Sequence, residues 1–163
     1  MKYLKINYCD YVNGTGLRTV LFVSGCTHHC KGCFQPETWD FDSGYELTNE
    51  VKEEIIDSAK YDYIDGITLL GGDPMEPANQ RGLLSLVKDF KTRFPGKTVW
   101  CYTGYTYERD LLDADGRART ECTDEFLSYI DVLVDGEFIK ELKDTSLEFR
   151  GSSNQRIIEI HQD

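Results

Sequence analysis

The chain has 163 residues, 40% of them apolar and 20 of them aromatic (two Trp, ten Tyr and eight Phe), and its net charge is −11. This composition predicts one globular domain over residues 1–163 and excludes an extended disordered chain. The excess of acids disfavours nucleic acid as a partner, because such affinity comes largely from neutralised phosphates. No apolar run approaches the roughly 20 residues of a membrane helix, and the start, MKYLKINYCDY, lacks a signal-peptide core. We therefore expect a cytoplasmic protein without membrane contact.

The N-terminal part predicts two strands joined by a turn. Residues 2–8 alternate charged and apolar side chains, and residues 17–23 are rich in Val, Leu and Phe. Gly14 and Gly16 lie between them and are more typical of a hairpin turn than of a phosphate loop, since no Gly-Lys-Ser/Thr follows. A cysteine-rich loop comes directly after the second strand.

The rest of the chain alternates helices with strands. Thr48 is a typical N-cap for a helix that reaches about residue 60. The later elements are predicted from apolar periodicity and from Gly and Pro residues that mark their ends. They are a strand at 66–70, a helix at 79–94, a strand at 98–102, short helices near 107–112 and 124–129, and strands at 131–135 and 156–160.

This alternation indicates an α/β fold with a mostly parallel sheet. A complete (β/α)₈ barrel takes about 250 residues, so this chain is long enough for only part of one. We therefore predict a partial, open-sided (β/α) barrel, which leaves room for a bulky substrate to approach from the side.

Three of the six cysteines fall within eight positions, with the spacing Cys26-x3-Cys30-x2-Cys33. In a reducing compartment such crowding indicates metal binding or redox chemistry. An electron-carrier ferredoxin needs four cysteines per cluster, whereas three would hold a [4Fe–4S] cluster with one open iron, where a small molecule can bind and react. Two alternatives stay open. His28 or His29 could complete a Cys₃His zinc site, and a distant cysteine could close the cluster.

Other candidate residues follow the ends of predicted strands, where α/β folds build their sites. Glycines at such positions permit close approach of the backbone to a ligand. The candidates are Gly71, Gly72, Asp73 and Pro74 after one strand, Thr103 and Gly104 after the next, and Asp135 at the end of a third.

The cysteine spacing after a strand resembles that of the radical S-adenosylmethionine enzymes. Five segments in order, nearly spanning the chain, resemble the activating proteins of anaerobic (class III) ribonucleoside-triphosphate reductases. They are GLRTVLFVSGCTHHCKGCFQPETWDF, GITLLGGDP, WCYTGY, DVLVDGEF and FRGSSNQR. The cysteine motif alone marks the superfamily, and its combination with TGY, DGEF and SSNQR is much more specific.

The resemblance implies a mechanism. Cys26, Cys30 and Cys33 would hold the [4Fe–4S] cluster, and S-adenosyl-L-methionine would chelate the open iron. An electron from a flavodoxin-type donor would pass to the sulfonium, whose carbon–sulfur bond breaks to give methionine and a 5′-deoxyadenosyl radical. That radical would take a hydrogen atom from a glycine on the large reductase subunit and leave a glycyl radical there. The cofactor supplies the radical chemistry, and the protein positions the reacting groups and excludes competing reactions.

The resemblance also assigns cofactor contacts. Gly32, Cys33 and Phe34 would flank S-adenosylmethionine, with Phe34 over the adenine. The Gly71–Pro74 segment would meet its amino group, largely through backbone oxygens. Thr103 and Gly104 could reach its ribose or carboxylate. Asp135 could position the cofactor or a cation, or simply start the turn at Gly136. Two other functions remain: an activase of another glycyl radical enzyme, such as pyruvate formate-lyase, and a zinc-stabilised binding module without catalysis.

Overall fold

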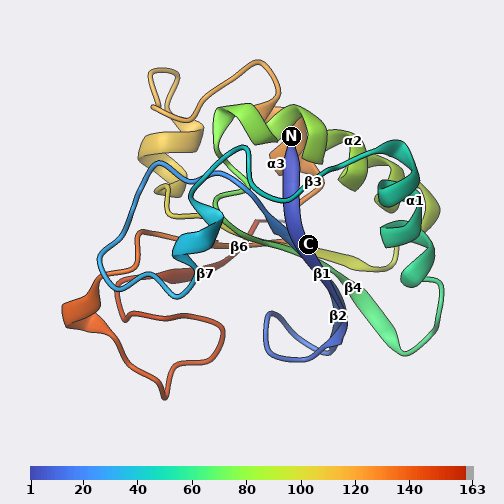
Figure 1. Cartoon of the computed structure of the whole chain (residues 1–163), viewed down its shortest axis with the longest axis horizontal. Helices are drawn as coiled ribbons and strands as arrows, with labels where there is room; N and C mark the ends of the chain where they lie inside the picture. Colours follow the sequence, from blue (N-terminus) through green and yellow to red (C-terminus); the bar gives the residue numbers. More distant parts are fainter. Residues whose placement is uncertain (161–163) are drawn as a thin grey trace.

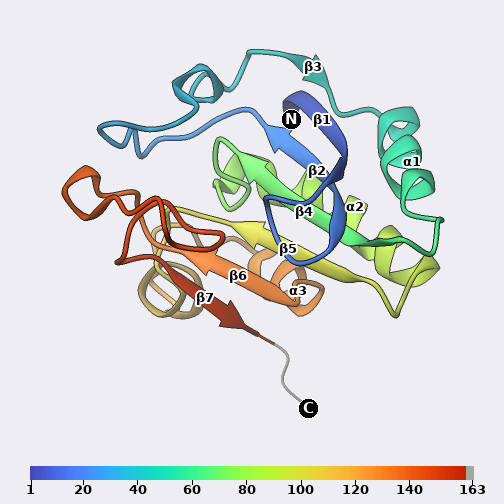
Figure 2. The ribbon, with the colours of Figure 1, turned by 90° about the horizontal axis from the view of Figure 1, so that it is seen from below.

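The computed structural model describes residues 1–160, which form one mixed seven-stranded sheet. In chain order its strands are β1 (Lys2–Asp10), β2 (Leu17–Val23), β3 (Tyr45–Glu46), β4 (Ile64–Gly71), β5 (Thr98–Tyr102), β6 (Val132–Asp135) and β7 (Arg156–Glu159). Across the sheet the order is β3-β1-β2-β4-β5-β6-β7. The strands β2, β4, β5 and β6 are parallel neighbours, so their carboxyl ends meet at one edge, while β7 runs the other way (Figure 2).

Three helices lie together on one side of the sheet (Figure 1). They are α1 (Asn49–Ser58), α2 (Pro77–Arg93) and α3 (Thr123–Ser128). Three short helical turns complete the structure: η1 (Pro36–Thr38), η2 (Tyr107–Leu112) and η3 (Lys140–Leu142). The Thr48 cap of α1 is confirmed, because its side chain accepts a hydrogen bond from the Val51 amide at 3.2 Å.

The main core forms where one face of the sheet meets the helices. Successive side chains of a strand point to opposite faces, so Leu21, Leu69 and Cys101 all face α2 and its neighbours. Leu83, Leu86, Val87 and Phe90 supply the apolar side of α2 and are completely buried. Cys101 is thus a buried core residue, as its neighbours in the sequence predict.

The other face of the sheet carries a buried arginine. Arg18, on β2, is fully buried and lies near the ring of Trp100 on β5. The N–H groups of its guanidinium donate to Thr68 Oγ1 and to the carbonyl oxygens of Thr15, Ile67 and Thr98, at 2.7–3.1 Å. This side chain therefore ties β2, β4 and β5 together at the end opposite the cysteine loop.

The four central strands are parallel, as predicted for most of the sheet, and the edge strands pair antiparallel. The hairpin predicted around Gly14 and Gly16 is confirmed, and it makes β1 antiparallel to β2. β7 returns after a long loop without a crossover helix, so it pairs antiparallel with β6. In the part of the chain that the structure describes, no helix has both the length and the apolar composition to cross a membrane. The partial barrel and the single domain stay predictions.

Candidate functional site

A cavity of about 430 Å³ opens at the carboxyl ends of the parallel strands. Most of the residues predicted for the site line it, although they come from three separate parts of the sequence. They are Cys26, Cys30, Cys33, Phe34, Gly71, Gly72, Asp73, Thr103 and Gly104. The fold therefore brings together the cysteine loop and the segments that follow β4 and β5.

Three predicted residues do not line this cavity. Gly32 is exposed in the cysteine loop at φ +79°, and Pro74 is buried. Asp135 lines a neighbouring cavity of about 320 Å³ and accepts hydrogen bonds from Arg156 at 2.6 and 3.0 Å. Asp135 Oδ2 also accepts a hydrogen bond from the Tyr107 amide, so the contacts of this carboxylate stabilise the sheet edge. A direct role of these three residues in cofactor binding stays a prediction.

Sequence reasoning missed much of the cavity wall. The β6–β7 loop contributes Gly136, Phe138, Phe149, Arg150, Gly151 and Gln155. These residues lie in the DGEF and FRGSSNQR segments, which the sequence analysis had already singled out. The local sequence pattern, however, does not show that this tail segment folds back over β5. Phe149 does so by packing its ring edge-on against Trp100, with centroids 5.2 Å apart.

The three cysteine sulfurs sit in a partly buried loop that is rich in N–H donors. The Gln35 amide donates to Cys33 Sγ at 3.4 Å, and the amides of His28 and His29 do the same for Cys26. Burial and the nearby Asp73 carboxylate raise the pKa of Cys26 to about 12, because these amides offset only part of their effect. A metal that binds here would displace the thiol protons, as metal sites do.

Gly71 and Gly72 face the backbone at the end of the neighbouring strand β2. A Cβ on Gly71 would come within 2.5 Å of the Val23 amide nitrogen, and one on Gly72 within 2.4 Å of the Gly25 oxygen. Gly71 also has φ +111°, which L side chains rarely adopt. These glycines therefore let the end of β4 pack directly against the start of the cysteine loop.

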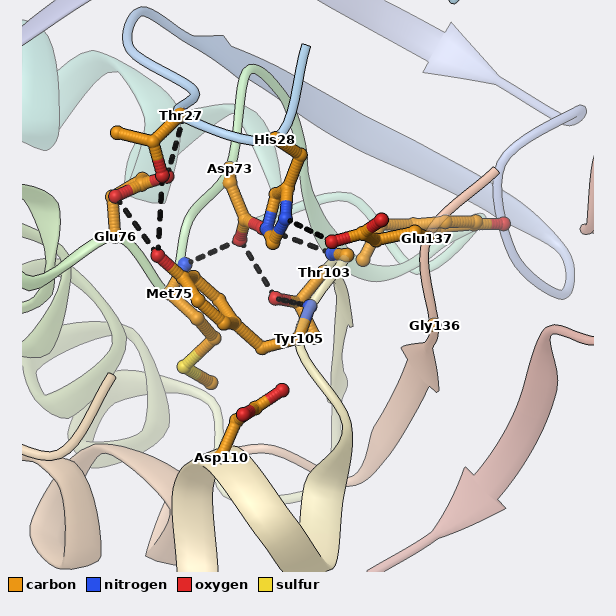
Figure 3. Close-up of polar contacts among 12 residues, drawn as sticks. Thr27, His28, Asp73, Met75, Glu76, Thr103, Tyr105, Asp110, Gly136 and Glu137 are labelled. Atoms are coloured by element: carbon orange, nitrogen blue, oxygen red, sulfur yellow. Dashed lines mark hydrogen bonds and ion pairs between the residues drawn. The ribbon is translucent and has the colours of Figure 1, made fainter. Parts of the chain in front are cut away.

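The Asp73 carboxylate is buried and forms four hydrogen bonds (Figure 3). Its Oδ1 accepts from the Met75 amide at 2.9 Å and from Thr103 Oγ1 at 2.8 Å. Its Oδ2 accepts from the Gly104 amide at 2.9 Å and pairs with His28 Nε2 at 2.8 Å. A carboxylate has about four acceptor positions, so the side chain is fully used by the protein.

His28 bridges two carboxylates. Its Nε2 faces Asp73, and its Nδ1 lies 2.9 Å from Glu137 Oε1. Burial alone would lower the pKa of His28, but the hydrogen bonds to Asp73 and Glu137 raise it above its ordinary value. Glu137 also contacts Arg117 at 3.4 Å, and Arg117 pairs in turn with the buried Asp110 at 3.0 Å.

Glu76 holds the same loop one residue earlier. Its Oε1 accepts from both the amide and the hydroxyl of Thr27 at 2.7 Å, and its Oε2 accepts from the Tyr105 hydroxyl at 3.1 Å. One ligand atom each of Cys26, His28 and Glu76 lies within 4.8 Å of the others. His28 and Glu76 are engaged by protein groups, so this trio does not form an open metal site.

Three buried polar atoms of the described residues have no hydrogen-bond partner: Trp39 Nε1, Tyr102 Oη and Arg150 Nε. All three belong to residues that line the 430 Å³ cavity, and all three are donors. Buried donors are normally satisfied, since an unmade hydrogen bond costs on the order of 1–3 kcal/mol. Three residues of the cavity lining therefore carry a buried donor that no group of residues 1–160 uses.

Comparison with known families and proteins identifies the family of this chain. The 4Fe–4S single cluster domain family matches residues 12–158. The anaerobic ribonucleoside-triphosphate reductase-activating protein of Vibrio cholerae is 47% identical over 159 residues, which cover 96% of this chain and 97% of the relative. The proteins of the same name from Escherichia coli strain K12 and from phage T4 are 43% and 41% identical over 157 residues each.

These matches cover 95–96% of this chain and 96% and 93% of those two relatives. The family match at residues 12–158 includes the cysteine loop, the segments after β4 and β5, and the part of the β6–β7 loop that lines the cavity. The chain thus belongs to the 4Fe–4S single cluster domain family and, within it, to the anaerobic ribonucleoside-triphosphate reductase-activating proteins.

Proposed function

We propose that this protein is a radical S-adenosylmethionine activase that generates the glycyl radical of an anaerobic ribonucleoside-triphosphate reductase. The observation that carries the proposal is one cavity whose lining residues include three cysteines and three side chains with a buried donor unpartnered within residues 1–160. A bound [4Fe–4S] cluster and S-adenosylmethionine would supply the 5′-deoxyadenosyl radical, with the electron from a flavodoxin-type donor. The protein's part is to bind, orient and shield these groups.

The spread of the sulfurs supports a cluster over a single zinc ion. Zn–S bonds of 2.3 Å in a tetrahedral site place the sulfurs about 3.8 Å apart. Within residues 1–160, however, the only trio of His, Cys, Asp or Glu ligand atoms gathered within 4.8 Å is that of Cys26, His28 and Glu76. A cubane cluster accepts a wider spread, because each sulfur binds a different iron.

The positions of the other cysteines support an open iron. Cys9 is exposed on β1, while Cys101 and Cys122 are buried, and none of the three lines the cavity. Only Cys26, Cys30 and Cys33 are therefore available as sulfur ligands there. A fourth coordination position is left for a small molecule, the arrangement that separates catalytic from structural metal sites.

The unpartnered donors support S-adenosylmethionine as that molecule. Its carboxylate, ribose hydroxyls and adenine nitrogens are acceptors, and we assign Trp39, Tyr102 and Arg150 to bind such groups. Phe34 is 62% exposed at the rim, where its ring packs 5.0 Å from that of Phe138. An exposed aromatic face is suited to stacking on adenine. The exposed rim would also admit a glycine-bearing segment of the reductase subunit.

Anaerobic reconstitution tests the proposal. The iron- and sulfide-loaded protein with a strong reductant should convert S-adenosylmethionine to 5′-deoxyadenosine. The change Cys30→Ala should abolish this reaction, and Cys9→Ala, outside the cavity, should not. Full activity of Cys30→Ala, or purified protein that holds zinc without iron, would refute the proposal. Glycyl radical spectra after mixing with the reductase or with pyruvate formate-lyase would identify the partner.

A further inference from the structure

The three residues between Cys26 and Cys30 are all anchored by side chains outside the cysteine loop. Thr27 is held by Glu76, and His28 is held by Asp73 and Glu137 (Figure 3). The ring of His29 stacks on Trp39, with centroids 4.3 Å apart and planes at 12°. His29 also has φ +48°, an uncommon conformation for a residue other than glycine, and its stacking on Trp39 helps to hold it there.

The contacts of His28 are the most specific of the three. Its side chain is only 2% exposed, and its partners lie 45 and 109 residues away, at the ends of β4 and β6. A Cβ on Gly104 would come within 2.7 Å of the ring, and Tyr105 packs edge-on at 4.4 Å. The ring therefore fills a closely fitted space between three strand ends.

The four hydrogen bonds of Asp73 determine how this residue can act. Met75, Thr103, Gly104 and His28 occupy its acceptor positions, and the side chain is 1% exposed. No acceptor position is left for the amino group of a ligand. The Asp73 carboxylate thus acts on the cluster site only by fixing its four hydrogen-bond partners, His28 among them. Asp73 is therefore a positioning residue.

We propose that Thr27, His28 and His29, here called the spacer clamp, hold the cysteine loop in its ligand-binding geometry before any cluster is bound. Asp73, Glu76 and Glu137 are its positioning residues. The inference rests on the proposed role of Cys26, Cys30 and Cys33 as cluster ligands. A preorganised loop loses less conformational entropy when the cluster binds, and fixed outer contacts strengthen metal retention, typically 10–100-fold.

Hydrogen exchange at residue resolution tests the clamp in the full-length, metal-free chain. The Thr27 amide donates to Glu76 and the Cys26 amide to the Trp39 carbonyl at 3.2 Å, so both should be protected. In His28→Asn, whose shorter side chain cannot span two carboxylates, both amides should exchange about tenfold faster or more. Glu137→Gln, at a half-exposed position, should also raise the exchange rates of both amides, but by a smaller factor.

Asp131→Asn is the matched control. Asp131, like Asp73 and Glu76, accepts from a backbone amide, that of Val99 at 2.7 Å, but it lies at the opposite end of β5 and β6. This change should leave the exchange of the cysteine loop unaltered. Cluster-loaded His28→Asn should also lose iron to a chelator about tenfold faster than the parent protein.

Unprotected Thr27 and Cys26 amides in the metal-free parent chain would overturn the inference. So would unchanged exchange in a folded His28→Asn variant. If that variant does not fold, as judged by circular dichroism, Glu137→Gln decides, and unchanged loop exchange there would overturn it. None of these measurements requires S-adenosylmethionine cleavage, so failure of the clamp and failure of the proposed activity are distinguishable.

Discussion

Two tyrosines near the cavity differ in how their hydroxyls are satisfied. The Tyr105 hydroxyl donates to Glu76. Tyr102 lines the cavity, and its buried hydroxyl has no hydrogen-bond partner among residues 1–160. Burial raises the pKa of both, to about 12 for Tyr105, so both hydroxyls are protonated donors near neutral pH. An unsatisfied donor lowers the stability of the chain alone, which is expected where a residue is built to meet a ligand.

The first prediction compares Tyr102→Phe with Tyr105→Phe. Without ligand, Tyr102→Phe should leave the free energy of unfolding unchanged or raise it, because it removes an unpaired group. Tyr105→Phe should lower it by about 1–3 kcal/mol, because Glu76 Oε2 loses its donor. Binding of S-adenosylmethionine to the cluster-loaded protein should weaken about tenfold in Tyr102→Phe, the value of one hydrogen bond. A stability loss without any loss of affinity would contradict the assignment.

At the scale of elements, Arg18 links three strands where no cofactor is expected. Burial lowers its pKa to about 10, and its charge is met by a hydroxyl and three carbonyl oxygens, with no carboxylate of residues 1–160 in an ion pair with it. A Cβ on Gly66 would lie 2.6 Å from Arg18 Nη2, so glycine there makes room for the guanidinium. Arg18 and the four oxygens that it contacts thus form a buried polar cluster, here called the polar plug, near the amino-terminal ends of the parallel strands.

The second prediction concerns this plug. Arg18→Met should lower the free energy of unfolding by roughly 2–4 kcal/mol, because buried carbonyl groups lose their donors. Arg18→Lys should recover only part of the loss, since an ammonium cannot reproduce the planar fork of donors. Denaturant titrations measure both changes. Equal midpoints for Arg18→Met and the parent chain would show that the plug adds no net stability.

The third prediction concerns pH and η2, which lies between β5 and α3. Burial tends to raise the pKa of Asp110, but hydrogen bonds from the Thr106 amide and from Arg117 outweigh it, and the net shift is downward. A depressed acidic pKa contributes stability above the unfolded-state pKa and loses it as pH falls through the folded-state value. Asp110→Asn should therefore destabilise the protein at pH 7 and much less at pH 3. Urea unfolding at both values measures the difference, and an equal loss at both would contradict it.

For the whole molecule, the sequence predicted local features well and distant contacts poorly. Every helix and strand with clear apolar periodicity appears within a few residues of its expected place, as α1 with its Thr48 cap illustrates. The two-residue strand β3 was missed, because two residues carry no period. The side-chain contacts of His28 were also missed, since no local pattern encodes a hydrogen bond to Glu137 across 109 residues. Residues that line the cavity could be predicted from motifs, but the unpartnered donors of Trp39, Tyr102 and Arg150 could be found only from the fold.

The central claim is that one iron of the cluster is left for S-adenosylmethionine. Electron–nuclear double resonance on the reduced, cluster-loaded protein, with ¹⁵N and ¹⁷O in the amino and carboxylate groups of the methionine moiety, tests it most directly. The account predicts hyperfine coupling of both labelled atoms to the cluster, and the loss of that coupling when unlabelled compound displaces them. A cluster that shows no coupling with the compound in excess, and four cysteine ligands instead of three, would contradict it.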